Sequence, residues 1–327
     1  MNNLPNLETV IDNRNGTLWD VSQLVPELSW KTSRIGKPGQ VDMTLIRGPS
    51  YQQQFEVSPG DVIRIRQDGQ KLFYGYVFSI EETHERELRI TAYDQIRYLM
   101  ESDTYVRTNV TATQVIRDNA LAVGLILGEL ADTKHRIPKF LQDGQKRIDI
   151  ICAALDETLM ATGRLYVLFD DAGNLVLRDV EDMAIDLILG DGSLVYGYSV
   201  KREIDTDTYN RVKLVKDNKK TGRREAYIVQ DSSTIARWGR LQYYQKVDEG
   251  LNEAQITAMM NRFLELKNRE QRRFSLEALG YPGVRAGVKL QVTMEELGVN
   301  QFYLVEECTH HFSGDEHTMD LELKVYG

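Results

Sequence analysis

Alternating apolar and polar positions recur along this chain and predict a protein built mainly from β-strands. The alternation is clear at residues 28–31 and 41–47, and it returns after residue 195, at 209–215 and 226–229. A half-buried antiparallel sheet explains a period of two, because successive side chains point to opposite faces of a strand. We expect the strands at 196–200, 209–215 and 226–229 to find their partners among the C-terminal strands.

One strand-turn-strand pattern occurs twice in the sequence, at residues 59–94 and 286–326. Pro59-Gly60 precedes the first copy and Ala286-Gly287 the second, and each pair leads into an alternating run, a polar turn and an apolar run. Each copy continues through a charged loop with a histidine, His84 or His317, into another alternating strand. The repeat predicts two related small β-barrels, with a positive φ at Gly60 and Gly287 where the chain turns into a strand.

Helical periodicity separates and interrupts the two β regions. One amphipathic segment begins near Thr111 and ends at Gly124, and a second runs from residue 149 to Gly163, ahead of a predicted hairpin at 165–178. Asn252, with Gln255 three residues later, is a candidate N-cap for a long segment that extends through Arg273.

The predicted fold class is α+β, mainly β: two related small β-barrels with an intervening α/β module and a helical insertion in the second barrel. The predicted domains are a first β-barrel at 1–108, an α/β module at 109–190, a second β-barrel at 191–248 and 275–327, and a helical insertion at 249–274.

Composition narrows the classes of function. The 327 residues suggest about two domains, and 42% hydrophobic content is enough to build cores. A net charge of -9 disfavours non-specific binding to nucleic acid. The sequence shows neither a secretion signal nor an apolar run long enough to span a bilayer. Cys152 and Cys308 form no metal-like spacing with each other and suggest a reducing compartment.

The best metal candidate is Cys308 with His310, His311 and His317, since thiolate and imidazole are zinc ligands. On a strand, Cys308 and His310 share one face while His311 points to the other, so only a subset could converge. The interpretation as ordinary strand residues is favoured, and the role of the four is left open. We predict no catalytic, cofactor-binding or metal-binding residues, and no cofactor.

Two acidic pairs, Asp170-Asp171 and Glu306-Glu307, could in principle serve in acid-base catalysis. The first falls in the predicted hairpin turn, where aspartate is expected for structural reasons. The chain also lacks a G-x-S-x-G elbow, an H-E-x-x-H motif and a Walker loop. These observations weaken an enzymatic interpretation.

Basic residues gather at 213–220 and 269–273. A solvated hairpin tip and a charged helix end explain them, and a docking site for an acidic protein is the alternative. Sixteen tyrosines, many of them on predicted strands, suit both sheets and protein interfaces.

Three short motifs, taken in order, resemble those of tail-hub and baseplate-hub proteins of contractile phage tails, prophages and tailocins. They are the run 59–65 leading to 73–77, the strand Tyr209-Asn210-Arg211-Val212, and the turn Gly280-Tyr281-Pro282-Gly283-Val284-Arg285-Ala286-Gly287. The chain is most similar to the XkdQ/YqbQ-type hubs of Gram-positive prophages, over essentially its whole length.

The resemblance implies a non-enzymatic structural hub: a homotrimer whose six barrels form a pseudo-hexameric ring. Such a ring joins a hexameric tail tube to a trimeric spike. The implied partners are the tube, spike, tape measure and baseplate wedge proteins, and the implied location is the virion or a phage-tail-like particle assembled in the host cytoplasm. With no further domain after the second barrel, the spike is expected to be a separate polypeptide.

Two alternatives stay open. A peptidoglycan hydrolase acting at the tail tip is the first, because some hub relatives carry that activity. The second is a carbohydrate-binding β-module, which requires exposed aromatic platforms on one sheet face. Whether the particle is a phage or a bacteriocin, and which surface meets the tube or the spike, is not encoded in any motif.

Overall fold

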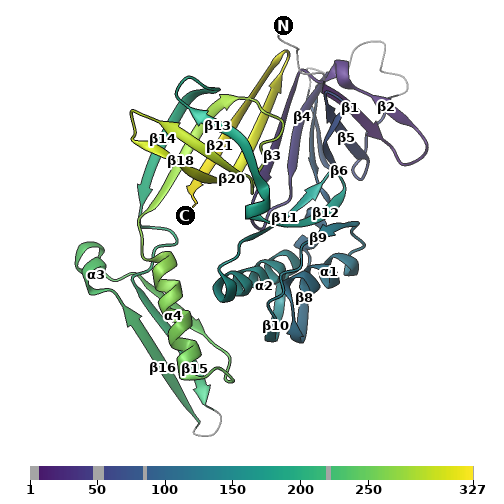
Figure 1. Ribbon diagram of the computed structural model, residues 1–327. Coiled ribbons are helices and arrows are strands. Elements are labelled where there is room, and N and C mark those ends of the chain that lie inside the picture. Colours follow the sequence, from purple (N-terminus) through teal and green to yellow (C-terminus); the bar gives the residue numbers. More distant parts are fainter. Residues whose placement is uncertain (1–6, 47–54, 84–86, 219–221, 327) are drawn as a thin grey trace. The chain divides into compact units, whose positions relative to one another are not determined.

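A computed structural model describes residues 7–46, 55–83, 87–218 and 222–326 (Figure 1). The described chain forms two compact units: a larger one from residues 1–155, 164–199 and 274–327, and a smaller one from residues 156–163 and 200–273. His84, residue 47 of the run 41–47, and residues 219 and 220 of the first basic run lie outside the described residues. Among the helices of the described ranges, none is long and apolar enough to cross a membrane.

The main sheet has thirteen described strands. They are β1 (Leu7–Asp12), β2 (Leu18–Asp20), β3 (Glu27–Ser33), β4 (Gln40–Ile46), β5 (Val62–Gln67), β6 (Gln70–Glu82), β7 (Glu87–Tyr93), β13 (Ala184–Gly190), β14 (Val195–Glu203), β18 (Gln271–Leu279), β19 (Lys289–Met294), β20 (Val299–Ser313) and β21 (Glu316–Val325). Three short 3₁₀ helices, η1 (Ser22–Leu24), η2 (Gln95–Met100) and η3 (Val180–Met183), adjoin these strands.

The sheet consists of two halves with one strand order. The first half runs β3-β4-β7-β6-β5-β1 and the second runs β14-β18-β21-β20-β19-β13. Taken in chain order, with β2 set aside, the six strands of each half correspond one to one. The predicted repeat is therefore confirmed as a repeat of strand order, because residues 59–94 and 286–326 both form a three-stranded antiparallel meander. Closure of each half into a barrel stays a prediction.

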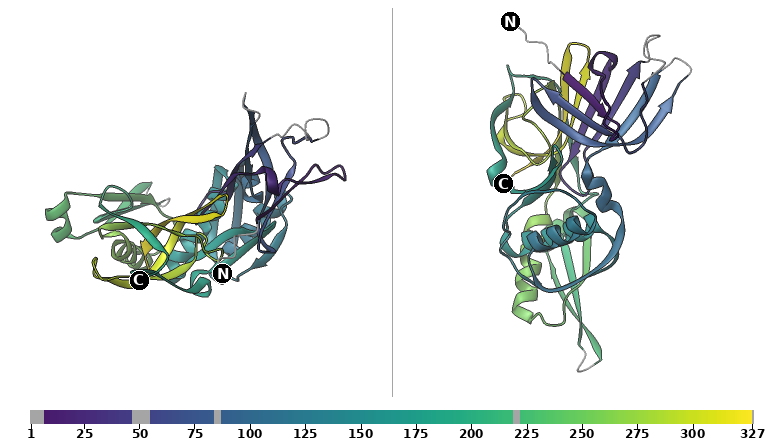
Figure 2. Two further views of the ribbon diagram at one scale, coloured as in Figure 1. Left: turned by 90° about the horizontal axis from the view of Figure 1, so that it is seen from above. Right: turned by 90° about the vertical axis from the view of Figure 1, so that its right-hand side faces the viewer.

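The two halves join because β20 has two partners along one edge. Its first part pairs with β19 and its second part, from Glu307 to Ser313, pairs antiparallel with β3. Along the opposite edge β20 pairs with β21. The purple and blue first half therefore lies beside the yellow second half (Figure 2). We call the β3-β20 pairing the seam.

The predicted glycine conformations are confirmed. Gly60 has φ 96° and Gly287 has φ 93°. In both places the glycine N–H donates to a strand carbonyl, that of Val77 in the first half and that of Val305 in the second, both at 2.8 Å. The two turns thus make the same main-chain hydrogen bond to the central strand of the meander in each half.

A helix-containing region lies between the halves in sequence. Helix α1 (Ala112–Ala122) begins at the N-cap Thr111, as predicted, and helix α2 (Arg147–Thr162) spans the second predicted segment. A ribbon of β8 (Ser102–Val110) and β10 (Ile137–Lys146) and a small sheet of β9 (Leu127–Leu130), β11 (Tyr166–Asp171) and β12 (Asn174–Asp179) complete it. Buried residues of these elements, including Ile116, Phe140 and Ile151, form one core cluster.

The smaller unit contains β15 (Arg211–Asn218), β16 (Arg223–Gln230), β17 (Gln242–Lys246), α3 (Ser232–Trp238) and α4 (Glu253–Lys267). The predicted pairing with C-terminal strands is confirmed for the strand at 196–200, because β14 pairs with β18. It is wrong for the strands at 209–215 and 226–229, because β15 has β16 on one edge and β17 on the other. Helix α4 supplies Ile256, Met260 and Phe263 to a core with Val212 and Leu214. Strand β15 is therefore paired along both of its edges, and helix α4 covers one face of the sheet, so β15 needs no partner from the C-terminal strands.

Helix α4 confirms its predicted start and corrects its predicted end. Asn252 and Gln255 form a reciprocal capping box. The helix ends at Lys267, not at Arg273, because Gln271 already belongs to strand β18. The described residues form mainly β-strands together with helices, which confirms the predicted fold class at this level.

Candidate functional site

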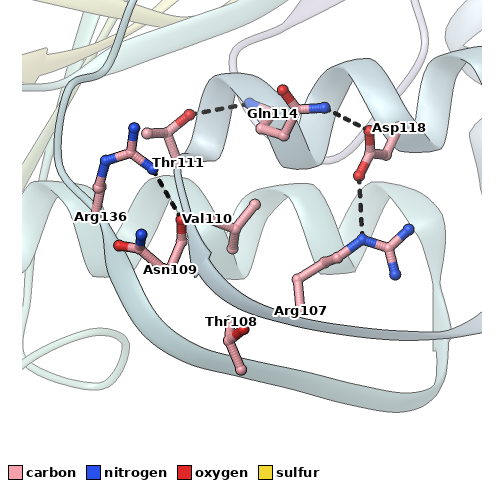
Figure 3. A pocket seen from close by; sticks show the side chains of 8 residues that line it. All are labelled: Arg107, Thr108, Asn109, Val110, Thr111, Gln114, Asp118 and Arg136. Carbon is pink, nitrogen blue, oxygen red and sulfur yellow. Dashed lines mark hydrogen bonds and ion pairs between the residues drawn. The ribbon is translucent and has the colours of Figure 1, made fainter.

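A polar depression of about 440 Å³ lies beside α1 and β8 (Figure 3). Its polar groups bind one another: Arg107 lies 3.6 Å from Asp118, Gln114 donates to Asp118 at 2.6 Å, and Arg136 donates to the carbonyl of Asn109 at 3.0 Å. Its lining brings no nucleophile to a general base. This pocket holds no catalytic arrangement.

Cys308, His310 and His317 come together, and His311 does not. Cys308 and His310 are buried on one face of β20, whereas His311 is exposed and pairs with Asp320 at 2.9 Å, as the strand alternation predicted. Neither these three nor any other group of three or more His, Cys, Asp or Glu side chains in the described residues is arranged so that it could hold a metal ion.

The buried histidines form a hydrogen-bonded chain. His310 Nε2 lies 2.8 Å from the carbonyl of Val284, which requires Nε2 to donate. His310 Nδ1 then accepts from His317 Nε2 at 2.9 Å, and His317 Nδ1 accepts from the Gln67 amide at 3.2 Å. Every nitrogen is satisfied in the neutral form. Burial lowers the pKa of His310 and of His317 to about 4, so both are neutral near pH 7.

Asp170 belongs to a buried polar cluster that sequence reasoning interpreted only as a turn. Its carboxylate accepts from the Gly173 N–H and the Gln95 amide, both at 2.7 Å, so its turn role is also real. Arg285 is half-buried, with its guanidinium 4.2 Å from the ring centre of Phe169 and donating to the Asp170 carbonyl at 3.1 Å. Burial raises the pKa of Asp170 and lowers that of Arg285.

Asp94 completes this cluster, and its pKa is raised by burial and by the charge of Asp170. It accepts from the N–H of Gly39 at 2.7 Å and from Ile96 at 2.9 Å. The cluster ties the end of β7, the β11-β12 hairpin and the turn before β19 together. Its sequence signal was a single arginine inside the otherwise uncharged run 284–288.

The second acidic pair, Glu306-Glu307, lies at the seam. Glu306 pairs with Arg34 at 2.9 Å, while Glu307 contacts Lys31 at 2.8 Å and Lys37 at 2.9 Å. Burial opposes ionisation of Glu307, yet the two lysines together lower its pKa to about 2. Both carboxylates are ion-pair partners, and the lowered pKa of Glu307 makes that residue unsuited to proton transfer near neutral pH.

The seam also buries side chains that lie far apart in sequence. The Trp30 ring stacks on His310 with centroids 5.2 Å apart, and Leu28 and Phe312 share one core cluster. The Thr32 hydroxyl accepts from the N–H of Ala286 at 3.0 Å. Main-chain pairing, side-chain packing and ion pairs thus all hold the two strands of the seam together.

The predicted basic runs are largely paired within the smaller unit. Lys216 lies 3.4 Å from Glu225, Arg272 lies 3.4 Å from Glu270, and Arg273 lies 3.2 Å from Glu203. The solvated interpretation explains these contacts, and a docking role for the runs stays a prediction.

A family model described as YQBQ-like matches residues 28–324, from the start of β3 to the end of β21. The chain belongs to the YQBQ-like family. A relative in Bacillus subtilis strain 168, the phage-like element PBSX protein XkdQ, is 32% identical over 307 residues, covering 92% of this chain and 93% of the relative. The predicted XkdQ/YqbQ-type membership is confirmed.

Solved structures share the fold. A tail protein from Neisseria meningitidis MC58 superposes with a TM-score of 0.73 at 14% identity, covering 98% of this chain and 96% of that one. The 43 kDa tail protein of prophage MuSo2 from Shewanella oneidensis gives 0.69 at 15% identity, covering 97% and 98%. The six-strand order repeated here is therefore set in a fold that phage tail proteins also adopt.

Proposed function

We propose that this protein is a phage-tail or baseplate hub: a non-enzymatic homotrimer that joins a hexameric tail tube to a trimeric spike. The observation that carries the proposal is the presence of two half-sheets of one strand order in a single chain. Three such chains present six similar half-sheets to a sixfold neighbour, while the smaller unit, present once per chain, stays threefold. Each half-sheet closes into a barrel in this arrangement.

Family membership supports the setting. The relative is named as a protein of a phage-like element, and the fold is shared with tail proteins. Under the proposal, the partners are the tube, spike, tape measure and baseplate wedge proteins. The protein then resides in the tail baseplate of a virion or phage-tail-like particle after assembly in the host cytoplasm.

The peptidoglycan hydrolase alternative gains no support from the site. The single carboxylate that lines the pocket, Asp118, is engaged by Arg107 and Gln114. Two carboxylates with raised pKa values, Asp94 and Asp170, are buried in the cluster around Arg285, and a third, Glu157, is exposed on α2 and does not line the pocket.

Two measurements test the proposal. Native mass spectrometry of the full chain is expected to give three times the chain mass of 37.5 kDa. Particles purified from a host lacking the gene are expected to show tubes without a spike-bearing end, and the gene supplied in trans restores that end. A single-chain mass together with intact particles contradicts the hub. Solubilisation of purified peptidoglycan above a heat-denatured control favours the hydrolase.

A further inference from the structure

The seam inside one chain is a template for a contact between chains. In the second half, Val305 N donates to the Val288 carbonyl at 2.9 Å, a bulge follows between Val305 and Glu307, and β20 then leaves β19 and pairs with β3. The bulge redirects the strand edge toward its new partner.

The first half repeats every step except the last. Val77 N donates to the Asp61 carbonyl at 2.8 Å, and a bulge follows between Val77 and Ser79. Residues Ser79 to Glu82 of β6 then pair with β7 along one edge. Along the other edge, where β20 meets β3, no strand of the described ranges pairs with residues 79–81. We call residues 79–81 the β6 overhang.

The missing partner has a counterpart in the second half. Strand β14 occupies the position there that β3 occupies in the first half, and it is the terminal strand of the described sheet order. Its side chains Tyr196 and Tyr198 are 58% and 41% exposed, whereas Leu28 and Trp30 on β3 are 3% and 5% exposed. Proteins rarely leave an apolar edge strand uncovered, because it recruits other strands.

From this correspondence we propose that the β6 overhang of one copy pairs antiparallel with β14 of a second copy. The inference rests on the proposed trimer and names the residues that hold it together. The contact is heterologous, since the two copies use different strands, and rotation by a third of a turn closes it into a ring of three. Each chain then contains one internal seam. Its overhang pairs with one neighbouring chain, and its β14 pairs with the other.

Charge supports this occupant. The overhang ends on Glu81, and β14 carries Lys201 and Arg202. The two cations remain 64% and 59% exposed in their ion pairs with Glu203 and Glu270. The opposite charges of the two strands favour this pairing over a β14-β14 contact, which places like charges together.

The experiment blocks one edge at a time in the full chain. Thr83 N donates to the Glu87 carbonyl, so the alternation of an antiparallel ladder directs the Ile80 N–H away from β7. Ile80→Pro therefore removes an N–H of the free edge without removing a bond to β7. The double change Tyr196→Lys and Tyr198→Lys blocks β14, because lysines on an edge strand oppose strand addition.

Matched controls keep the result specific. Ile80→Val retains the N–H, and Tyr244→Lys changes a strand tyrosine of the smaller unit that is 51% exposed. If Ile80→Pro lowers the melting temperature by more than a few degrees, the pair Ser79→Lys and Glu81→Lys replaces it, since both side chains are exposed.

Native mass spectrometry provides the readout. We expect the wild type and both controls to give the three-chain mass and each blocked variant to give the single-chain mass. An equimolar mixture of the two blocked variants is expected to give a two-chain complex, because one unblocked overhang meets one unblocked β14. Blocked variants that still form trimers overturn the strand pairing and leave the hub intact. A mixture that stays monomeric also overturns the pairing, and a wild-type chain that stays monomeric overturns both proposals.

Discussion

The two halves of the sheet share a strand order but differ in what surrounds it. Strand β1 runs antiparallel to β5 in the first half, whereas its counterpart β13 runs parallel to β19. The second half also carries β15, β16, α3, β17 and α4 between β14 and β18, where the first half joins β3 directly to β4. The six-strand order therefore tolerates a large insertion between two strands, and it tolerates either direction of the strand beside β5 or β19. The central meander is kept in both halves. What the halves share is the meander and its glycine turn.

The largest expected contrast comes from the two glycine turns. A Cβ on Gly287 meets Val167 Cγ1 at 2.8 Å, while a Cβ on Gly60 meets no described atom within 4 Å. Both positions carry strain from positive φ, about 1–3 kcal/mol, and Gly287→Val adds overpacking of about 1–3 kcal/mol. Urea unfolding of Gly60→Val and Gly287→Val checks this. Equal losses of stability contradict the packing difference.

Arg285 occupies a position in the second half that corresponds to Ser58 in the first. Arg285→Ser makes the two turns alike and leaves Asp94 and Asp170 without their cation. Removal of one partner from a buried ionic group typically lowers the free energy of unfolding by about 3–5 kcal/mol. Ser58→Ala is the control, and its melting temperature is expected to stay within a few degrees of wild type. A stable Arg285→Ser variant indicates that the carboxylates are protonated without cost.

Acid weakens the second half through its histidines. The pKa of His310 and of His317 is about 4 when folded and about 6.5 when unfolded. Their contribution is complete above pH 6.5 and is lost as the pH falls toward 4, by at most about 1.4 kcal/mol per pH unit for His310, and less for the more exposed His317. His310→Gln is expected to flatten the loss of melting temperature between pH 6.5 and 5. Parallel curves for variant and wild type contradict this.

The seam supplies the smallest expected effect. Thr32→Val keeps the shape of the side chain but leaves the Ala286 N–H without its acceptor. A buried unsatisfied donor costs about 1–3 kcal/mol. Chemical denaturation measures the loss, and Thr44→Val, on the neighbouring strand β4, serves as the control. A Thr32→Val variant as stable as wild type shows that water replaces the hydroxyl.

The sequence predicted features that are local. Alternation located the meanders, Pro59-Gly60 and Ala286-Gly287 located equivalent turns, and Asn252 with Gln255 located a helix start. Each depends on neighbours a few residues apart, which a single sequence displays directly.

Long-range partners could not be predicted from the same signals. Alternation shows that a strand has one buried face but not what covers it, so the strand at 209–215 was assigned to the wrong sheet. The contact of His317 with Gln67 joins residues 250 positions apart, and no local pattern marks either one. Arg285 was passed over because burial of a charge is visible only once its carboxylate partners are placed beside it.

The double pairing of β20 has a consequence for the entropy of assembly. A ring of six half-sheets built from separate chains brings six bodies together and loses the translational and rotational freedom of five. Because β20 binds β3 within one chain, a ring of three chains forms half of its junctions during folding and loses the freedom of only two bodies. Covalent linkage sets the effective concentration of these internal junctions, so they stay formed at any dilution of the protein.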